Sequence, residues 1–226
     1  MHPFFKQIQP GINENIYSKD PSSSVLGKKI ILEGVNMIDE MGLEQFTFKK
    51  LAQKLETTES SIYRYFENKH NLLIYLTVWY WNWTEYKITM ATANLLPEQK
   101  LKAAIREICI PLSSDSPFAE IPVDKLLNII ISESPKAYLT KEVDGENKLG
   151  FFMSLKRVAN RLAEIILECN PDYPFPHSLA STIIESAHYQ KYFKLHMSSL
   201  SDAKTEDDLF LFFHDLAKKT IFSSLS

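Results

Sequence analysis

Apolar residues recur every three or four positions along most of the chain, which is the spacing of one face of an α-helix. From Ser24 onward this pattern predicts a first helix that ends at Met41–Gly42, where glycine suits a helix C-terminus. Thr47 is expected to cap a short second helix, and residues 60–66 to form a short third helix. The strict alternation that is typical of β-strands is missing from the sequence.

Longer helical patterns follow these three elements. Asn68 has the position of a cap for a helix that stays apolar on most sides until about residue 93. Beyond it, prolines interrupt the pattern, and further helices are predicted at residues 98–110, 122–134, 146–169, 177–199 and 206–224. The sequence therefore predicts an all-α fold, with three N-terminal helices, a long connector helix and a C-terminal helical bundle.

The overall charge of the chain gives no support to nucleic-acid binding by itself. Its 226 residues carry a formal net charge of −3, so any such function depends on where the charges lie locally. The two cysteines, Cys109 and Cys169, stand in apolar helical patterns, which predicts buried, reduced thiols. No apolar run is long enough to span a membrane and residues 1–20 do not resemble a signal peptide, so we expect a cytoplasmic protein without a membrane partner.

The sequence also lacks the motifs of common catalytic and cofactor sites. It has neither a nucleophile elbow nor a paired-carboxylate signature, and its six glycines form no phosphate-binding loop. His188 and His196 lie about two helical turns apart, but no cysteine or acidic cluster stands near them at metal-ligand spacing. We therefore expect neither an enzyme nor a protein with a bound metal or cofactor.

Two short helices joined by a tight turn and packed on a longer first helix form a helix-turn-helix, a common DNA-binding arrangement. The second helix of such a pair needs short polar side chains at its start, because these reach base edges and phosphates without steric conflict. Thr57, Thr58, Ser60 and Ser61 meet this need. Arg64 lies one turn further along, within reach of a guanine edge or a phosphate.

Three further residues near this helix suit a DNA surface. Tyr63 and Tyr65 are amphipathic, so a hydroxyl group is available to the DNA backbone while the ring packs on the protein. Lys69 stands in the first turn of the next helix, where the helix dipole disfavours a cation. A phosphate beside Lys69 would explain its position.

The segment FTFKKLAQKLETTESSIYRYFENKHNLL, which begins at Phe46, resembles the DNA-binding segment of TetR-type transcriptional regulators. The resemblance extends back to about residue 25 and rests on residues at the family's spacing, namely Thr47, Leu51, Ala52, Leu55, Ile62, Tyr63, Phe66, Lys69 and Leu72. It implies DNA contacts from Lys28, Thr47, Lys49, Thr57, Thr58, Glu59, Ser60, Ser61, Tyr63, Arg64, Tyr65 and Lys69. The expected partner is a double-stranded, pseudo-palindromic DNA operator.

Some residues depart from the family's pattern. Glu56 stands in the turn where the family usually has glycine, and Glu59 where a basic or small residue is common. Residues 24–76 carry as many acidic as basic side chains, which predicts modest non-specific affinity and a shallow salt dependence. Glu59 either accepts a hydrogen bond from a cytosine amino group or is an acid stabilised by the helix dipole. Thr47 is a helix cap, with or without a phosphate contact.

Residues 1–23 contain several prolines and show no apolar period, which predicts a flexible arm. The predicted helix-turn-helix domain spans residues 24–70, and the resemblance implies a helical effector-binding and dimerisation domain over residues 71–226. The last two predicted helices suit a four-helix interface between two copies, because large and small apolar residues alternate along them. The predicted interface residues are Leu179, Ile183, Ala187, Phe210, Phe213, Leu216 and Ala217. Core packing within one chain is the alternative role for these residues.

The connector helix carries a conspicuous aromatic run, VWYWNW, over residues 78–83. A helix that is apolar on several sides is buried on several sides, and aromatic walls with few polar groups suit a hydrophobic ligand. The predicted effector pocket consists of Trp79, Tyr80, Trp83, Phe152, Tyr189 and Tyr192. Core packing is again the alternative role for each side chain.

We therefore expect a homodimeric TetR-like regulator, in the form of a repressor that a hydrophobic small-molecule effector releases from its operator. Repression is the commoner mode of the family and follows from the resemblance alone. The alternative from another functional class is an all-helical ligand- or protein-binding module whose DNA binding is weak or lost. Local charge neutrality and Glu59 favour that alternative, which predicts little DNA affinity even at low salt.

Overall fold

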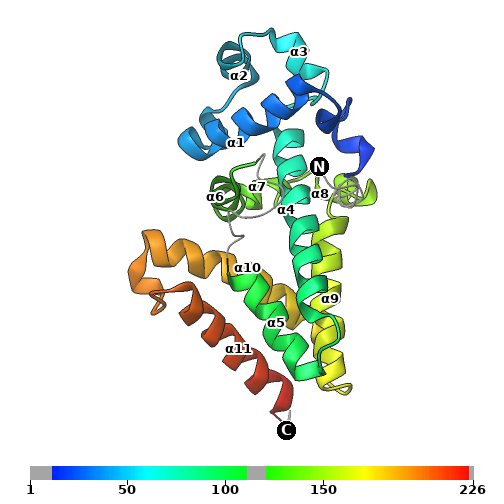
Figure 1. The fold of residues 1–226 in the computed structure, drawn as a ribbon, viewed down its shortest axis with the longest axis vertical. Helices are drawn as coiled ribbons and strands as arrows, with labels where there is room; N and C mark the ends of the chain where they lie inside the picture. Colours follow the sequence, from blue (N-terminus) through cyan, green and yellow to red (C-terminus); the bar gives the residue numbers. More distant parts are fainter. Residues whose placement is uncertain (1–11, 111–120, 224–226) are drawn as a thin grey trace. The chain divides into compact units, whose positions relative to one another are not determined.

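The computed structural model describes residues 12–110 and 121–223, and every regular element in those ranges is a helix (Figure 1). The all-α prediction is therefore confirmed. None of the helices in the described ranges is both long enough and apolar enough to cross a membrane.

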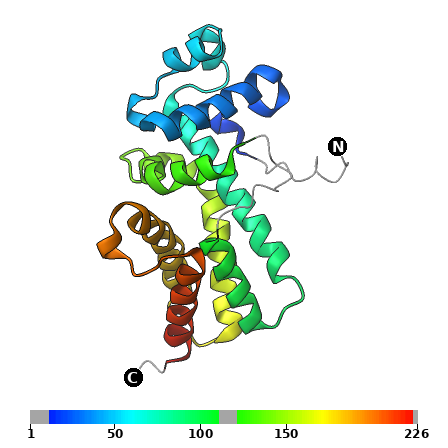
Figure 2. The ribbon, with the colours of Figure 1, turned by 60° about the vertical axis from the view of Figure 1, so that its left-hand side comes forward.

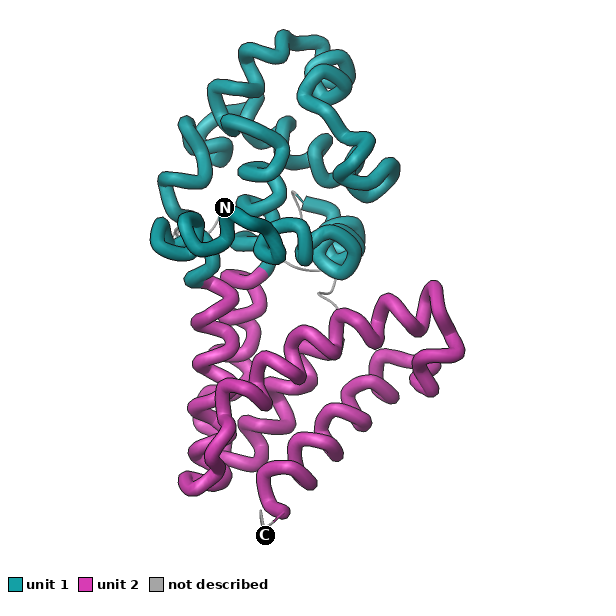
Figure 3. Tube along the Cα trace, turned by 180° about the vertical axis from the view of Figure 1, so that it is seen from behind, with its two compact units in different colours: residues 1–80, 112–153 teal, residues 81–111, 154–226 magenta. Residues whose placement is uncertain are grey.

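The chain divides into two compact units, which Figure 3 shows in different colours. Unit 1 takes in residues 1–80 and 112–153, as far as they are described, and unit 2 takes in residues 81–111 and 154–226. The predicted boundary after residue 70 does not coincide with this division. The middle of the chain groups with the N-terminal helices because the helix that begins at Val123 packs against the first long helix.

The N-terminal segment of unit 1 contains two short 3₁₀ helices, η2 (Glu14–Ile16) and η3 (Pro21–Ser23). Each is capped by the side chain that precedes it. The Asn13 side chain accepts a hydrogen bond from a backbone amide of η2, and Asp20 does the same for η3. These local hydrogen bonds are typical of Asn and Asp at turns.

A close backbone approach holds this N-terminal segment against the first long helix. A Cβ atom at Gly27 would lie 2.2 Å from the Pro21 carbonyl oxygen, so no larger residue fits without a shift of the backbone. Ile16 is fully buried as well. The prediction of a flexible arm is therefore wrong for residues 12–23, because close backbone contact and a buried side chain fix them. Residues 1–11 lie outside the described ranges.

Three helices follow in the predicted order, namely α1 (Val25–Gln45), α2 (Phe48–Lys54) and α3 (Glu59–Tyr63). The Ser24 hydroxyl caps α1 by accepting a hydrogen bond from the Gly27 amide at 3.0 Å. Gly42 interrupts α1 with a φ of +75°, close to its predicted end, and one further turn runs on to Gln45. A left-handed φ of this kind favours glycine, because it has no Cβ atom to clash.

The third helix is shorter than predicted. Its last residue is Tyr63, and the amides of Tyr65 and Phe66 both donate to the Ile62 carbonyl, at 2.8 and 3.2 Å. This turn closes the helix before the predicted end at residue 66. It therefore changes which of the following side chains face the core.

The long helix α4 (Lys69–Thr92) begins where the sequence predicts. The Asn68 side chain caps it by accepting a hydrogen bond from the Asn71 amide at 2.9 Å. Its residues up to Tyr80 belong to unit 1 and the remainder belong to unit 2. Most of its side chains between residues 72 and 84 are buried, as expected for a helix that is apolar on several sides.

Unit 1 is completed by three helices, α6 (Val123–Glu133), α7 (Pro135–Tyr138) and α8 (Val143–Lys148). Of these, α6 lies along α1, as Figures 1 and 2 show. The sequence predicted α6 as a helix, whereas α7 lies outside the predicted helices and the helix predicted at residues 146–169 contains only the last three residues of α8. Helices this short contain too few residues to display an apolar period.

Unit 2 contains the second part of α4 and four further helices, α5 (Pro97–Cys109), α9 (Met153–Cys169), α10 (Pro176–His196) and α11 (Glu206–Phe222). The first residue of α9, Met153, still belongs to unit 1. A 3₁₀ turn, η4 (Ser198–Leu200), lies between α10 and α11. The helix α11 packs against α5 and α10, and α10 packs against α5. The ends of α5, α10 and α11 agree with the predictions within a few residues, whereas α9 begins later than the predicted residue 146.

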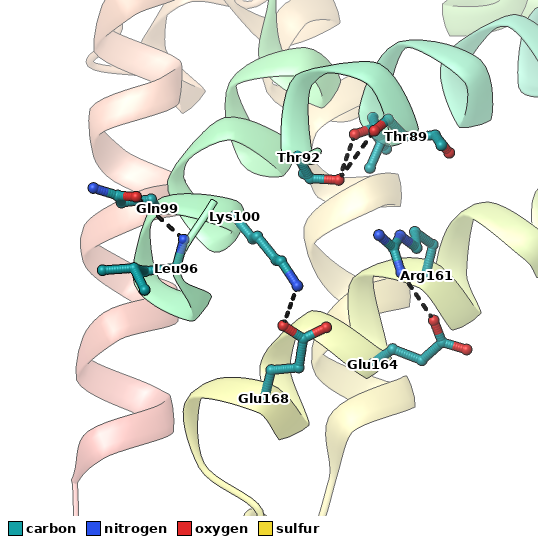
Figure 4. Close-up of polar contacts among 9 residues, drawn as sticks. Thr89, Thr92, Leu96, Gln99, Lys100, Arg161, Glu164 and Glu168 are labelled. Atoms are coloured by element: carbon teal, nitrogen blue, oxygen red, sulfur yellow. Dashed lines mark hydrogen bonds and ion pairs between the residues drawn. The ribbon is translucent and has the colours of Figure 1, made fainter. Parts of the chain in front are cut away.

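Polar contacts connect the elements of unit 2 around the turn from α4 to α5 (Figure 4). The Thr92 hydroxyl donates back to the Ile88 carbonyl at 2.7 Å, near the end of α4. The Gln99 side chain accepts a hydrogen bond from the Leu96 amide at 3.2 Å and so caps the start of α5. An ion pair of 2.6 Å between Lys100 and Glu168 links α5 to α9.

Both cysteines are free, as the sequence predicts. Cys109 is buried, and burial raises the pKa of its thiol to about 12, while Cys169 is half-buried. A thiol with so high a pKa stays protonated at neutral pH and is therefore unreactive. Within the described ranges, no group of three His, Cys, Asp or Glu side chains is placed to hold a metal ion.

Candidate nucleic-acid interface

The turn between α2 and α3 is closed by backbone hydrogen bonds. The Thr57 amide donates to the Ala52 carbonyl at 3.0 Å, and the Glu56 amide donates to the Gln53 carbonyl at 3.2 Å. Glu56 adopts a left-handed φ of +51°. A residue with a Cβ atom loses roughly 1 to 2 kcal/mol in that conformation, which gives the physical reason for glycine at the matching position of related sequences.

The start of α3 carries a connected cluster of hydroxyl groups, formed by Thr58, Ser60 and Ser61. The Thr58 hydroxyl caps the helix by accepting a hydrogen bond from the Ser61 amide at 3.3 Å. It also hydrogen-bonds the Ser60 hydroxyl at 2.8 Å and the Ser61 hydroxyl at 2.9 Å. Thr58 and Ser60 are exposed, while Ser61 is half-buried, and so is Thr57 just before the cluster.

The other side chains predicted to face DNA from α3 differ in how they are held. Tyr63 is 49% exposed, and its ring packs edge-on against Phe48 with centroids 5.2 Å apart. This contact ties α3 to α2 while the rest of the tyrosine ring stays accessible. Arg64 is exposed just after the helix, and Glu59 is exposed in its first turn.

The start of α2 provides a second exposed group. The Thr47 hydroxyl accepts a hydrogen bond from the Lys50 amide at 3.2 Å, which confirms its prediction as a helix cap. Lys49 is exposed beside it, and Lys28 is exposed in the first turn of α1. The structure thus leaves all three predicted side chains accessible.

Tyr65 does not belong to this surface. Only 3% of it is exposed, and its hydroxyl lies 2.8 Å from the Ser24 hydroxyl, at the start of α1. The Lys19 ammonium lies over its ring, 5.1 Å from the centroid. The prediction that Tyr65 faces DNA is therefore wrong. Because α3 ends at Tyr63, the chain turns and directs Tyr65 into the core.

Lys69 also has a different explanation from the one predicted. Its ammonium donates to the carbonyl oxygens of Leu43, Glu44 and Phe46, at 2.8, 3.2 and 3.4 Å. These carbonyls lie at the C-terminal end of α1, where a cation is favourable for the helix dipole. Three N–H groups are used by three acceptors, so no phosphate is needed to account for this lysine.

The residues predicted to line an effector pocket are divided between the two units. Trp79, Tyr80 and Phe152 are buried in unit 1, where Phe152 packs edge-on against Tyr138 with centroids 6.4 Å apart. Trp83, Tyr189 and Tyr192 belong to unit 2. A shared pocket for these six side chains remains a prediction.

Most of the residues predicted for a dimer interface lie in the core of unit 2. Six of the seven are buried, namely Leu179, Ile183, Ala187, Phe210, Phe213 and Ala217, and Leu216 is half-buried. The six buried side chains therefore have the alternative role, core packing within one chain, and an interface between two copies stays a prediction. The reason is that α11 is apolar on more than one side, and the side with these residues packs on α5 and α10. The large apolar side chains that α10 and α11 expose are Tyr189, Leu195, Leu211, Phe212 and Phe222.

Sequence reasoning missed several buried titratable side chains. Glu133 is 7% exposed and lies at the end of α6, before Pro135, which no local pattern marks as a site. In unit 2, Lys191 is 3% exposed and His188 is 5% exposed. Burial lowers the pKa of Lys191 to about 8 and that of His188 to about 3. The sequence showed only that His188 and His196 lie about two helical turns apart, and this spacing does not predict which of them is buried.

Comparison with known proteins agrees with the geometry of α2 and α3. Residues 30–76 match the family described as bacterial regulatory proteins, tetR family. That range begins in α1, ends in α4 and contains the whole α2–α3 pair. Among curated protein sequences, no match is found.

Several solved structures share the fold over nearly their whole length. AibR in complex with isovaleryl coenzyme A and operator DNA aligns with a TM-score of 0.59 at 16% identity, over 83% of this chain and 95% of that chain. The fatty acid degradation regulator FadR from Bacillus halodurans aligns with a TM-score of 0.58 at 21% identity, over 87% and 98% of the two chains. A tetR-family regulatory protein from Rhodococcus RHA1 aligns with a TM-score of 0.61 at 12% identity, over 91% of this chain and 99% of that chain. The chain therefore has the all-α fold of TetR-family regulators, and its residues 30–76 match the sequence pattern of that family.

Proposed function

We propose that this chain is a homodimeric, DNA-binding transcriptional regulator that acts in the cytoplasm and responds to a small molecule. One observation carries the proposal. Within the segment that matches the TetR family, α3 exposes Tyr63, Arg64 and the hydroxyls of Thr58 and Ser60 instead of using them in the core. Short hydroxyls and an arginine on one exposed helix suit base edges and phosphates.

The exposed residues divide into two groups by the DNA atoms they suit. Thr47, Lys49 and Lys28 stand at helix starts and would contact phosphates, which fix the position of the protein without reading sequence. Arg64 suits the guanine edge, with its two parallel N–H donors. Glu59 is the acidic exception, and we propose that it selects a cytosine amino group where one is present. Tyr65 is buried and Lys69 is occupied, so neither belongs to the proposed contact set.

We place the dimer interface on exposed apolar side chains of α10 and α11, namely Tyr189, Leu211, Phe212 and Phe222. Large apolar side chains that two neighbouring helices leave exposed are typical of association surfaces. Sedimentation tests this placement. The substitution Phe212→Glu should convert a dimer into a monomer, whereas Met90→Glu, at an exposed position of α4, should leave the dimer intact. The placement would be contradicted if the wild-type protein and both variants were all monomers.

We further propose that the effector is a hydrophobic small molecule and that its binding releases the protein from an operator, as a repressor requires. The aromatic side chains of α4 and α10 support a hydrophobic ligand. A ligand shifts the equilibrium only if it binds one conformation better than the other. A ligand-responsive regulator is supported by AibR, which shares the fold and has been solved in complex with isovaleryl coenzyme A and operator DNA. Release from the operator rests on the resemblance to the family alone.

Fluorescence anisotropy tests the DNA-binding proposal. Wild-type protein should bind DNA from upstream of its own gene at least about a thousandfold more tightly than scrambled DNA. Arg64→Ala should weaken specific binding by roughly 10- to 100-fold. The control Lys102→Ala removes an exposed positive charge from α5 and should have little effect. Equal, weak binding to both DNAs, followed by an empty genome-wide selection, would contradict the proposal.

The alternative function is a helical ligand- or protein-binding module without strong DNA binding. A specific observation favours it, since the hydroxyls of Thr58, Ser60 and Ser61 already hydrogen-bond one another and Glu59 is exposed beside them. Measurements at two salt concentrations separate the two functions. A DNA-binding protein loses affinity as salt rises, while the alternative shows feeble binding throughout.

A further inference from the structure

The end of α1 is a junction where side chains from several helices of unit 1 meet one short stretch of backbone. The stretch is residues 42–46, which starts at the left-handed Gly42 and ends just before Thr47, the cap of α2. The break at Gly42 interrupts the regular hydrogen-bond ladder of α1. The Phe46 amide still donates to the Gly42 carbonyl at 3.1 Å, but the Leu43 amide and the carbonyls of residues 43–46 have partners from outside the helix.

Glu133, the last residue of α6, supplies one of these partners. Its Oε1 accepts a hydrogen bond from the Leu43 amide at 3.2 Å, in a buried position. A buried carboxylate is costly unless it is paired and hydrogen-bonded. The second oxygen of Glu133 meets the Lys136 ammonium at 2.8 Å, and Lys136 also lies 3.4 Å from a carboxylate oxygen of Glu44. Glu133 is thus paired on both sides.

Two lysines supply further partners for the same stretch. Lys69, from the first turn of α4, donates to the carbonyls of Leu43, Glu44 and Phe46. Lys50, from α2, donates to the Gln45 carbonyl at 2.8 Å. Every residue from 43 to 46 therefore has a hydrogen bond or ion pair from another helix, or from the α6–α7 corner.

This arrangement gives Glu133 a role beyond its own contact. The stretch that it holds leads through Phe46 to Thr47, where α2 starts, and α2 in turn packs on α3. The Glu133 side chain comes from α6, a helix outside the helix-turn-helix. It is also close to the Gly42 backbone, since a Cβ atom at Gly42 would lie 3.4 Å from its Oε1.

We propose that Glu133 is a positioning residue for DNA binding, because its carboxylate fixes the α1–α2 corner in the orientation that α2 and α3 need to reach DNA together. This inference rests on the proposed DNA-binding function. It assigns to a single buried carboxylate of α6 a share in operator affinity although no part of it reaches the DNA-facing surface.

The test compares three variants in the anisotropy assay. Glu133→Ala removes the acceptor for the Leu43 amide and should weaken operator binding by about 10- to 100-fold, which corresponds to one lost charge-assisted hydrogen bond. Glu133→Gln keeps an oxygen for that amide and should bind the operator within about threefold of the wild-type protein. Asn128→Ala is the matched control, because Asn128 is also on α6 and contacts Asp39 of α1 at 3.0 Å, but on the surface.

Hydrogen exchange of the free proteins provides a second readout that needs no DNA. In Glu133→Ala the amides of residues 43–47 should exchange faster than in the wild type, while Asn128→Ala should leave them unchanged. Unchanged exchange at these amides would overturn the inference, as would unchanged operator affinity of Glu133→Ala or an equal loss in Asn128→Ala. If wild-type protein shows no operator preference, the proposed function itself fails, and the inference fails with it. If instead the wild-type protein prefers the operator and Glu133→Ala binds it equally well, only the inference about Glu133 fails and the proposed function stands.

Discussion

Two helix ends in this molecule are closed by lysine side chains that come from other helices. In unit 1, Lys69 of α4 donates to three carbonyl oxygens at the end of α1. In unit 2, Lys191 of α10 donates to the Ile108 carbonyl near the end of α5, at 3.1 Å. Both lysines place a cation at the negative end of a helix dipole.

The surroundings of the two ammonium groups differ. Lys69 is half-buried and has three acceptors, whereas Lys191 is 3% exposed and has one acceptor among the described residues. Burial lowers the pKa of Lys191 to about 8, although Cys109 and Glu206 act in the opposite direction. The comparison teaches that the same contact stabilises a helix end when the cation keeps enough partners, and costs free energy when burial outweighs them.

Removing the Lys69 ammonium should have the largest effect on stability. Lys69→Met keeps the apolar stem but leaves the carbonyls of Leu43, Glu44 and Phe46 without their donor. We expect the free energy of unfolding to fall by about 2 to 3 kcal/mol, the range for hydrogen bonds to a charged group. Urea titration measures this change. Lys69→Arg, which retains several donors, should lose less, and equal losses in both variants would break the comparison.

Acid should destabilise the chain through His188, which is buried next to Lys191 in α10. Burial, followed by the charge of Lys191, lowers the pKa of His188 to about 3, whereas the unfolded value is about 6.5. Between these values the unfolded chain binds the proton more tightly, so stability is present above pH 6.5 and is lost as the pH falls. The free energy of unfolding should drop by about 1.6 kcal/mol between pH 6.5 and pH 5.

Substitution identifies the source of this acid sensitivity. His188→Leu should remove that part of the pH dependence, while His177→Leu, at an exposed position of the same helix, should retain it. Urea titrations at both pH values provide the measurement. If the free energy of unfolding of His188→Leu still fell between pH 6.5 and pH 5 as in the wild type, groups other than His188 would cause the acid sensitivity.

Removing the Lys191 ammonium should have a smaller effect than removing that of Lys69. Lys191→Met exchanges a buried charge for an apolar side chain of similar size, so the free energy of unfolding at pH 7 should change by no more than about 1 kcal/mol. Wild-type stability should also rise as the pH increases from 8 to 10.5, because the folded state loses the Lys191 proton first. Lys191→Met should lack this rise, and a loss as large as that of Lys69→Met would contradict the comparison.

The smallest effect is expected for Lys50, the exposed lysine that donates to the Gln45 carbonyl. Lys50→Ala should lower the free energy of unfolding by at most about 0.5 kcal/mol, because water replaces the ammonium at an exposed carbonyl. A thermal melt beside that of Lys69→Met measures the difference. If Lys50→Ala lowered the free energy of unfolding by more than about 1 kcal/mol, solvent exposure would not explain the order of these lysine contacts.

The features that the sequence predicted correctly depend on neighbours along the chain. Thr47 and Asn68 cap helices because each hydroxyl or amide group meets a backbone amide three residues later. Gly42 lies where a left-handed φ breaks α1. Local rules of this kind need only a few consecutive residues.

The features that it missed depend on partners far away in the sequence. The hydrogen bond between Glu133 and Leu43 joins residues 90 positions apart, and the contact of Lys69 with Leu43 spans 26 positions. Tyr65 was misjudged because the helical period was continued past the true end of α3. The sequence left open whether Phe210, Phe213 and Ala217 pack in the core or in an interface for a related reason, since periodicity identifies apolar sides but not the helix that covers each one.

The hydroxyl groups at the start of α3 have a thermodynamic consequence for any DNA that they meet. The Thr58 hydroxyl already hydrogen-bonds the hydroxyls of Ser60 and Ser61, so a base or a phosphate that takes over one of these bonds replaces an existing partner and the total number of hydrogen bonds hardly grows. Exchange of this kind adds little net free energy. A mismatched base, however, disrupts the cluster without offering a new partner, and that loss counts in full. The cluster therefore favours discrimination between sequences over tightness of binding.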